Sequence, residues 1–426
     1  CDLPIFATMA FEAAGRTFLG TSPDIAAITL DALGADVVGI NCSLGPAELR
    51  PFAQAMLAVT AKPVMVQANA GLPHVEDGCT VFDIDPQSYA AAVANMVEDS
   101  VGIIGGCCGT NPDYIRLLAG IIADRAPQQR PAPASFTVTG AQRLVELPQD
   151  SHRVAVIGER INPTGKKRLQ AALREGNLDY VVGQGISQQE QGADVLDVNL
   201  GLPGIDEPRM IARAVEALQG ATLLPLQIDS TNADAIEAGV RAYAGKPIIN
   251  SVNGKQEVLD AVLPIAAHYG CNVIGLTLDE DGIPATASER VAIARRIIDE
   301  AARYGISRER ILIDCLVMTA STNQAQVTEI LRAVTLCRQE LGVHCTLGVS
   351  NVSFGLPARE LLNATFLAAA FGAGLDAPIM NPGSQRYMDA VYSYRVLNAE
   401  DLGSAQFIER YAGWDDPYKV PVSVAS

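Results

Sequence analysis

The sequence predicts an α/β fold: a complete (β/α)₈ TIM barrel in its second part, preceded by four βα units of a second, incomplete TIM barrel. After residue 150, eight apolar stretches able to form strands each run into one Asn or Asp and then break into Gly, Pro or a polar turn. Segments with helical periodicity, such as residues 208–220 and 289–305, separate these stretches. Eight successive βα units are typical of a barrel whose active site lies at the carboxyl ends of its strands. The stretches end at Asn162, Asn199, Asp229, Asn250, Asp279, Asp314, Asn351 and Asn381.

Before residue 125 the same alternation occurs, with four strand-like stretches at residues 3–11, 35–43, 62–70 and 101–109. Alternating strands and helices form parallel βα units, so these four correspond to half of an eight-stranded barrel. The segment that follows contains four prolines and little periodicity until its end, and we interpret it as a linker. The expected domains are a partial barrel at 1–124, the linker at 125–152 and a complete barrel at 153–426. Because the chain opens with Cys-Asp-Leu-Pro and enters a strand almost at once, we expect it to be a fragment of a longer protein.

Composition argues against several classes of function. The 31 Lys and Arg residues against 48 Asp and Glu residues give a formal net charge of −17, which argues against general binding to nucleic acid or to an anionic membrane. No uninterrupted apolar segment reaches the roughly 18 residues of a membrane helix, and no signal peptide is visible. The nine cysteines are spread thinly and do not suggest a disulfide framework. A reducing cytoplasm is the expected compartment.

Three cysteines follow predicted strand ends in the first part of the chain. Cys42 closes the second stretch, and Cys107 and Cys108 close the fourth, with glycines on both sides of the pair. These strand ends lie at the same edge of the predicted sheet, and the glycines allow the backbone to bend so that the thiols converge. Three thiolates would leave the fourth position of a tetrahedral zinc ion open for a thiol substrate. The alternative is that Cys42 is a small core residue and the vicinal pair is incidental, since no His supports the site.

The motifs GINCSLGP and GGCCGT resemble the signature of the homocysteine S-methyltransferase family. Their context, PIFATMAFEAAGRTFLGTS and VQANAGLP, is similar to the homocysteine domain of cobalamin-dependent methionine synthases. The resemblance implies that Cys42, Cys107 and Cys108 ligate zinc, with the sulfur of homocysteine as the fourth ligand. Compared with that domain, about the first half of the barrel is absent, together with the strand ends expected to make the remaining homocysteine contacts.

In the second part, the Asn and Asp residues at the strand ends form a predicted polar cup. A single such residue is usually a turn former, but eight at equivalent positions are better explained by a binding site. Asp229 and Asp314 supply carboxylates, and Asn199, Asn250 and Asn351 supply amides. A carboxylate can accept two hydrogen bonds from the N3–H and 2-amino group of a reduced pterin, and amides satisfy its remaining donors and acceptors. The cup therefore suits a pterin ring.

The motifs GERINPTG, DVLDVNLG, IDSTN, INSVNG, LIDCLVM and GVSNVSFGLPARELLN resemble, in this order, the pterin-binding family. That family includes dihydropteroate synthases and the methyltetrahydrofolate domain of methionine synthases, and LTLDEDGIP is similar to the second branch. The resemblance implies that Asp229, Asn250 and Asp314 hold the pterin ring. It also implies that Asn351 hydrogen-bonds N5 of the folate and that Arg359 orients the folate.

Asn351 is the expected catalytic residue. The methyl group leaves a tertiary amine, so N5 must gain a proton before or during transfer. No His stands at a strand end, and we expect a hydrogen-bond network around Asn351 that stabilises the N5-protonated form, with the proton arriving through water. Asp197 and Asn199 are expected to line the same end of the barrel. Glu159 and Arg160, in the first stretch, are interpreted as a core ion pair.

Together the resemblances imply methyl transfer from 5-methyltetrahydrofolate, through a cobalamin carrier, to zinc-bound homocysteine, giving methionine and tetrahydrofolate. The D-x-H-x-x-G cobalamin motif is incomplete: Asp150 and His152 begin it, but Ala155 stands at its glycine. The carrier is therefore expected in another domain or in a separate corrinoid protein. Two alternatives stay open. One is a dihydropteroate-synthase-like enzyme, for which only Arg359 offers a pyrophosphate contact near the last strand ends. The other is a methyltetrahydrofolate-binding module that serves a corrinoid protein and uses no thiol.

Overall fold

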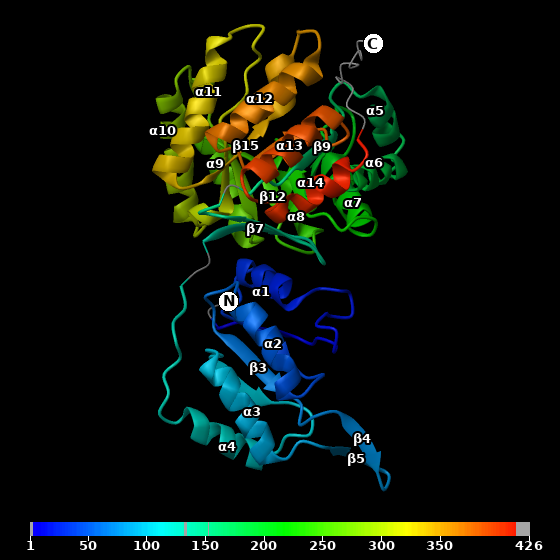
Figure 1. Cartoon of the computed structure of the whole chain (residues 1–426), viewed down its shortest axis with the longest axis vertical. Coiled ribbons are helices and arrows are strands. Elements are labelled where there is room, and N and C mark those ends of the chain that lie inside the picture. Colours follow the sequence, from blue (N-terminus) through cyan, green and yellow to red (C-terminus); the bar gives the residue numbers. More distant parts are fainter. Residues whose placement is uncertain (1–2, 132–133, 152, 415–426) are drawn as a thin grey trace, which may run out of the picture.

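The computed structural model describes residues 3–131, 134–151 and 153–414. It contains one closed barrel and one open four-stranded sheet, joined by an extended segment along one side of the molecule (Figure 1). Within the described ranges, no helix combines the length and apolarity needed to cross a membrane.

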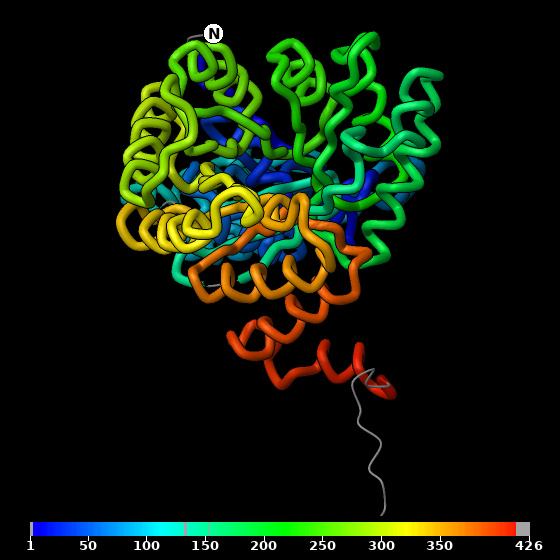
Figure 2. Tube along the Cα trace, turned by 90° about the horizontal axis from the view of Figure 1, so that it is seen from above, coloured from blue at the N-terminus to red at the C-terminus, as the bar shows by residue number. Residues whose placement is uncertain are grey.

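The second part of the chain is a closed barrel of eight parallel strands, which confirms the predicted fold. The strands are β9 (Ile157–Ile161), β10 (Val195–Asn199), β11 (Leu226–Asp229), β12 (Ile248–Asn253), β13 (Asn272–Leu276), β14 (Ile311–Asp314), β15 (His344–Gly348) and β16 (Ala377–Met380). Strand β16 pairs with β9 and closes the barrel. Seen from above, helices surround the strands, and the last helices lie outside that ring (Figure 2).

The helices of this part follow the strands in the order of consecutive βα units. They are α5 (Lys167–Arg174), α6 (Asp179–Glu190), α7 (Glu207–Gln219), α8 (Ala233–Arg241), α9 (Gln256–His268), α10 (Ala287–Arg303), α11 (Ala325–Leu336), α12 (Arg359–Ala373), α13 (Gln385–Leu397) and α14 (Ala405–Tyr411). Shorter helical turns are η1 (Arg308–Arg310), η2 (Cys337–Leu341), η3 (Val349–Ser353) and η4 (Leu402–Ser404).

Of the eight predicted strand ends, three match the structure, two (Asn162 and Asn381) lie one residue beyond their strands, and three differ by three residues. Asn250 lies inside β12, which continues to Asn253. Asp279 comes three residues after the end of β13 and forms a tight turn with Gly282. Asn351 lies in η3, because the chain turns into a 3₁₀ segment directly after Gly348. In all three places the strand ends at a different residue from the polar residue that closes the apolar run: later at Asn250, and earlier at Asp279 and Asn351.

A β-hairpin covers the amino-terminal end of the barrel. Its strands are β7 (Ser135–Thr139) and β8 (Leu144–Pro148). Phe136, Val138 and Leu147 are each 1% exposed and pack on the first residues of the barrel strands, such as Ile248 and Leu312. The hairpin lies within the segment interpreted as a linker and was not predicted from the sequence. This part of the segment is therefore a component of the barrel core.

Replacing Phe136 by alanine should lower the free energy of unfolding of the barrel by about 3–5 kcal/mol, because it leaves a cavity between the hairpin and the strands. Urea denaturation monitored by circular dichroism would measure the change. Phe18→Ala is a matched control, since Phe18 is 91% exposed and its loss should change stability by less than about 0.5 kcal/mol. Equal effects of the two substitutions would contradict the assignment of the hairpin to the core.

The first part of the chain is an open sheet of four parallel strands, as predicted. The strands, in spatial order, are β1 (Phe6–Met9), β2 (Val37–Asn41), β3 (Val64–Ala68) and β6 (Ile103–Gly106). The helices are α1 (Pro23–Ala32), α2 (Pro46–Leu57), α3 (Pro86–Glu98) and α4 (Pro112–Ile122). A hairpin that the sequence did not predict, β4 (Pro73–Glu76) with β5 (Cys79–Phe82), follows β3. Within the described residues, β1 and β6 each pair on one side only, so both edges of the sheet are open.

The two parts meet where helix α1 and the loop before it contact the hairpin at the amino-terminal end of the barrel. Helix α1 lies against the β7–β8 hairpin (Figure 1). Thr29 Oγ1 is 3.0 Å from Thr139 Oγ1, and Gln142 Nε2 donates to the carbonyl oxygen of Leu19 at 2.9 Å. The β4–β5 hairpin, which follows the carboxyl end of β3, lies far from the barrel (Figure 1). The carboxyl ends of the two strand sets therefore point away from each other.

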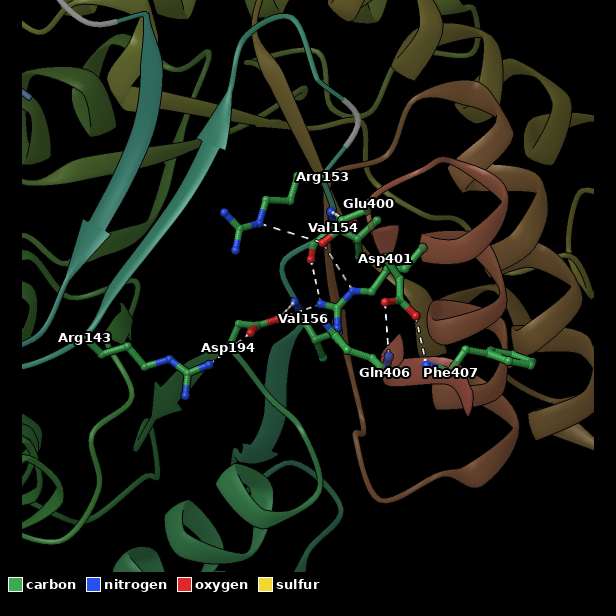
Figure 3. Close-up of polar contacts among 10 residues, drawn as sticks. Arg143, Arg153, Val154, Val156, Asp194, Glu400, Asp401, Gln406 and Phe407 are labelled. Atoms are coloured by element: carbon green, nitrogen blue, oxygen red, sulfur yellow. Dashed lines mark hydrogen bonds and ion pairs between the residues drawn. The ribbon is translucent and has the colours of Figure 1, made fainter. Parts of the chain in front are cut away.

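Ion pairs attach the last helices to the start of the barrel (Figure 3). Arg395 Nη2 lies 3.2 Å from Asp194 Oδ2, and Arg395 Nε lies 3.5 Å from Glu400 Oε1. Glu400 also accepts a hydrogen bond of 3.0 Å from the backbone N–H of Val154. Asp401 caps α14 by accepting from two backbone N–H groups. These contacts fix the C-terminal helices beside the first strand of the barrel.

Candidate functional site

Polar side chains from three neighbouring strands meet at the carboxyl end of the barrel. Asn199, Asp229 and Asn250 are paired in register across β10, β11 and β12. One layer deeper, Asp197 pairs with Gln227, whose Nε2 donates to Asp197 Oδ1 at 2.6 Å. Since side chains alternate along a strand, the two layers face the same interior. The predicted cup is present here as two stacked polar layers.

Burial raises the pKa values of the carboxyl groups in this cup. Asp197 is 3% exposed, and burial, followed by the charge of Asp229, raises its pKa well above the usual range. Burial also raises the pKa of Asp229 to about 6, while the amide of Asn199 opposes that shift. A ligand that brought N–H groups to these oxygens would replace the hydration they have lost and favour the charged form.

Asp314 ends β14 on the opposite side of the cup. Its Oδ1 accepts a hydrogen bond of 2.7 Å from the backbone N–H of Leu316, and burial raises its pKa to about 6. Arg290, from α10, donates to the carbonyl oxygens of Cys315 and Leu316, at 3.0 Å for Leu316. The guanidinium thereby fixes the loop that positions Asp314.

The sequence analysis did not single out Arg290. Its side chain is 0% exposed and shares the buried face of α10 with Ile293 and Ala294. The sequence did contain a signal for it: Arg290 occupies a position on the apolar face of the predicted helix. An arginine buried there needs hydrogen-bond acceptors, which points to a structural role.

Asn351 and Arg359 belong to one loop. Asn351 is exposed in η3. Arg359 Nη2 donates to the carbonyl oxygen of Ser350 at 2.8 Å, and its Nε donates to Ser353 Oγ at 3.0 Å. The guanidinium also lies 4.6 Å from the ring centre of Phe354. Arg359 therefore holds the turn on which Asn351 is presented to solvent.

Glu159 contacts this turn rather than its sequence neighbour. Ser350 Oγ lies 2.9 Å from Glu159 Oε1, and burial raises the pKa of Glu159. Among the described residues, no ion pair joins Glu159 to Arg160, so the core ion pair expected from the sequence was wrong. Adjacent residues of a strand point to opposite faces, which separates the two side chains. Lys166 Nζ donates to the backbone carbonyl oxygens of both residues at 3.2 Å.

The three predicted cysteines come together at the carboxyl end of the open sheet. The Sγ atoms of Cys42, Cys107 and Cys108 all lie within 4.8 Å of one another, and those of Cys42 and Cys108 are 3.7 Å apart. A tetrahedral zinc ion with Zn–S bonds of about 2.3 Å places its sulfur ligands about 3.8 Å apart. The thiol geometry therefore fits three ligands of such an ion.

Backbone contacts position these thiols. Cys42 and Ser43 have φ angles of 65° and 67°, and this left-handed turn brings Cys42 back over the sheet edge. Asn69 Oδ1, from the loop after β3, accepts a hydrogen bond of 3.1 Å from the backbone N–H of Cys108. The backbone N–H of Ser43 lowers the pKa of Cys42, whereas the contact with Cys42 raises the pKa of Cys108 to about 11. The contact therefore favours the ionised form of Cys42 over that of Cys108, and a bound cation would favour the ionised form of both.

The pterin binding enzyme family model matches residues 158–381, more than half of the chain. The chain belongs to the pterin binding enzyme family. The homocysteine S-methyltransferase model matches residues 1–122 of the same enzyme.

This pterin binding enzyme is 32% identical to the methionine synthase of Mycobacterium tuberculosis over 94% of its own length and 36% of that protein. It is 30% identical to the methionine synthase of Mycobacterium leprae over 92% of its length and 35% of that protein. The resemblance to methionine synthases expected from the sequence is confirmed. The chain spans about a third of the length of these curated relatives.

Among solved structures, the pterin binding enzyme resembles a dihydropteroate synthase of Yersinia pestis with a bound pterine-sulfa conjugate. The TM-score is 0.50 at 17% identity, over 62% of this chain and 100% of that chain. At this level of identity the similarity concerns the barrel fold.

Proposed function

We propose that this chain carries the folate module and part of the homocysteine module of a cobalamin-dependent methyltransferase. The reaction takes the methyl group from 5-methyltetrahydrofolate, through a cobalamin carrier, to zinc-bound homocysteine. The observation that carries the proposal is the presence in one chain of the amide-and-carboxylate cup and of the three-thiol cluster. The proposed modules are residues 1–124 and 153–426.

The proposed folate site uses the two polar layers of the cup. Asp314 accepts from the N–H edge of the pterin, with Asp229 and Asn250 around the ring and Asp197 and Asn199 lining the same end. Burial of these carboxylates strengthens hydrogen bonds to a ligand, because the local dielectric constant is low. Arg359 orients the folate and, through its contacts with Ser350 and Ser353, also fixes η3.

Asn351 is the proposed catalytic residue, because the turn that carries it, η3, contacts the buried acid Glu159 through Ser350. As the methyl group leaves, N5 becomes more basic and must hold a proton. The amide of Asn351 would stabilise the protonated N5 by a hydrogen bond that strengthens with charge. Next to it, Ser350 contacts Glu159, whose raised pKa keeps a proton available nearer to neutral pH.

The proposed homocysteine site holds zinc through Cys42, Cys107 and Cys108. When bound, zinc supplies a Lewis acid that lowers the pKa of a coordinated substrate thiol. Asn69 holds the backbone of Cys108, and the turn at Cys42 and Ser43 aims the first thiol at the same point. The two sites lie at strand ends that point away from each other, so the proposed carrier must reach both. A cobalamin domain outside this chain or a separate corrinoid protein would supply it.

A transfer assay tests this function. Full chain, 5-methyltetrahydrofolate and free cob(I)alamin should yield methylcobalamin, followed by its absorbance. Asp229→Asn should slow the transfer, since the charge-assisted contact to the pterin is replaced by a neutral one. Folate binding without any methyl transfer to cob(I)alamin would reject catalysis by this chain and leave a binding module.

The affinity for folate should fall as the pH decreases below about 6. Burial raises the pKa values of Asp229 and Asp314 to about 6, so below that pH each increasingly carries a proton and stops acting as a double acceptor. For one such group the loss approaches tenfold per pH unit. Calorimetry with a folate analogue whose ring does not titrate between pH 5 and 8 would measure it. Asp314→Asn should remove the part of the pH dependence due to Asp314, and an unchanged profile in that variant would contradict its role.

A further inference from the structure

A cavity of about 520 Å³ lies where the amino-terminal ends of the two parts meet. Asp31 and Lys62 line it from the open-sheet part, Thr137 from the β7–β8 hairpin, and Lys246 and Arg310 from the barrel. This volume is within the range of about 300–1,000 Å³ that small-ligand sites occupy. It lies at the opposite end of the barrel from the polar cup, so neither proposed substrate site includes it.

Lys246 places a buried amine beside this cavity. Its side chain is 8% exposed, and Nζ donates to Thr137 Oγ1 at 3.0 Å. Among the residues that the structure describes, its ammonium group forms no ion pair. Burial, followed by the charge of Arg310, lowers its pKa to about 7. Buried charges are normally paired, so this amine either loses its proton or requires an anion from outside the chain.

Arg310 faces the same cavity with part of its guanidinium unused. Nε and Nη2 donate to the carbonyl oxygens of Cys271 and Ala266, at distances between 2.6 and 3.2 Å. In the described part of the chain, Nη1 has no hydrogen-bond partner. Burial lowers the pKa of Arg310, but guanidinium groups stay charged in proteins. The cavity therefore contains a permanent positive charge beside Lys246.

The acidic groups nearby do not balance these cations. Asp31 accepts from Thr60 Oγ1 at 2.5 Å, and its charge only partly opposes the lowering of the pKa of Lys246 and of Arg310 by burial. Glu309 is paired with Arg308 at 3.3 Å. The Cys271 thiol stays neutral, because burial raises its pKa to about 12. With Lys62 on the opposite wall, the lining with Lys246 protonated has three cations, Lys62, Lys246 and Arg310, against these two carboxylates.

We propose that this cavity binds a small oxyanion of the sulfate or phosphate class, held by Lys246 and Arg310 from the barrel and by Lys62 from the open-sheet part. Such an anion would supply the acceptors that these donors lack, through charge-assisted hydrogen bonds. Because its ligands come from both parts, binding would also tie the two parts together. The inference is independent of the proposed methyl transfer.

Calorimetric titration of the full chain with sodium sulfate tests the proposal, with ionic strength kept constant by sodium chloride. Sulfate remains a dianion between pH 6 and 8.5, so any change over this range comes from the protein. Binding should be saturable, and about 30-fold weaker at pH 8.5 than at pH 6, because Lys246, with its pKa of about 7, loses its proton in between. Lys246→Met should weaken binding at pH 6 by at least about tenfold and remove the pH dependence.

Lys62→Met provides a second test, because Lys62 is only half-buried and its loss should not endanger folding. It should weaken sulfate binding at both pH values while keeping the pH dependence. Lys167→Met, an exposed residue at the start of α5, is the matched control and should bind as the parent does. Absence of saturable binding, or equal binding by the parent, Lys246→Met and Lys62→Met proteins, would overturn the proposal and indicate that Lys246 is neutral.

Discussion

Replacing Asn351 by alanine should slow methyl transfer by about 10²–10⁴-fold, the usual contribution of assistance to a proton transfer. Binding of 5-methyltetrahydrofolate should change by less than about threefold. Asn351 is exposed in η3, so its removal leaves no buried group without a partner in the ligand-free protein. Its proposed contact with N5 strengthens only as the methyl group departs, which is why the rate is affected more than binding.

Asp314→Asn should weaken folate binding more than Asn351→Ala does. Asp314 is 8% exposed and is proposed to accept from the pterin edge, so the substitution should cost about 1–3 kcal/mol of folate binding. Single-turnover kinetics with cob(I)alamin and equilibrium binding of the folate would separate the two effects. Asn95→Ala, an exposed asparagine on α3, is a control that should change neither. If Asn351→Ala and Asp314→Asn lost binding to the same extent, the distinction between a catalytic and a binding residue would be wrong.

The barrel could be predicted because its strands are buried on both faces. Such strands are nearly continuous apolar runs that stand out from amphipathic helices. The stretch at 193–199, for example, contains β10, whose boundary at Asn199 is as expected. Boundaries were less accurate where the chain continues in a regular way beyond the apolar run. Asn351 was assigned to a strand end, but the 3₁₀ turn after Gly348 was not visible in the pattern.

Features that depend on contacts between distant segments could not be predicted. The hairpin strands β7 and β8 are only five residues each, and their burial depends on the open end of a barrel formed by residues that follow later. Lys246 and Arg310 are unremarkable basic residues in the sequence, and only the contact between the two parts encloses them. The cysteine cluster is the exception, because the glycines around Cys107 and Cys108 already indicated a bend at a strand end.

Removal of the zinc proposed at the three thiols should destabilise the open-sheet part of the molecule and spare the barrel. Thiolate ligation couples metal binding to folding. The three Sγ atoms already lie within 4.8 Å of one another, so the folded protein needs little rearrangement to bind the metal. Because the sheet has two open edges, we expect weak or substoichiometric binding. Saturation at about 100 times the dissociation constant would still contribute about 2.7 kcal/mol. For a unit of this size, that corresponds to a shift of about 10 °C in melting temperature.

Thermal melts of the zinc-loaded full chain, with and without a chelator, would measure this effect. Two transitions are expected, of which only the one belonging to the open-sheet part moves. Cys107→Ser should abolish zinc binding and should leave a melt that the chelator does not change. Cys79→Ser is the matched control, because Cys79 is exposed on β5 and lies outside the cluster. A single transition that the chelator does not move, together with no zinc by elemental analysis, would mean that the three thiols converge without binding a metal.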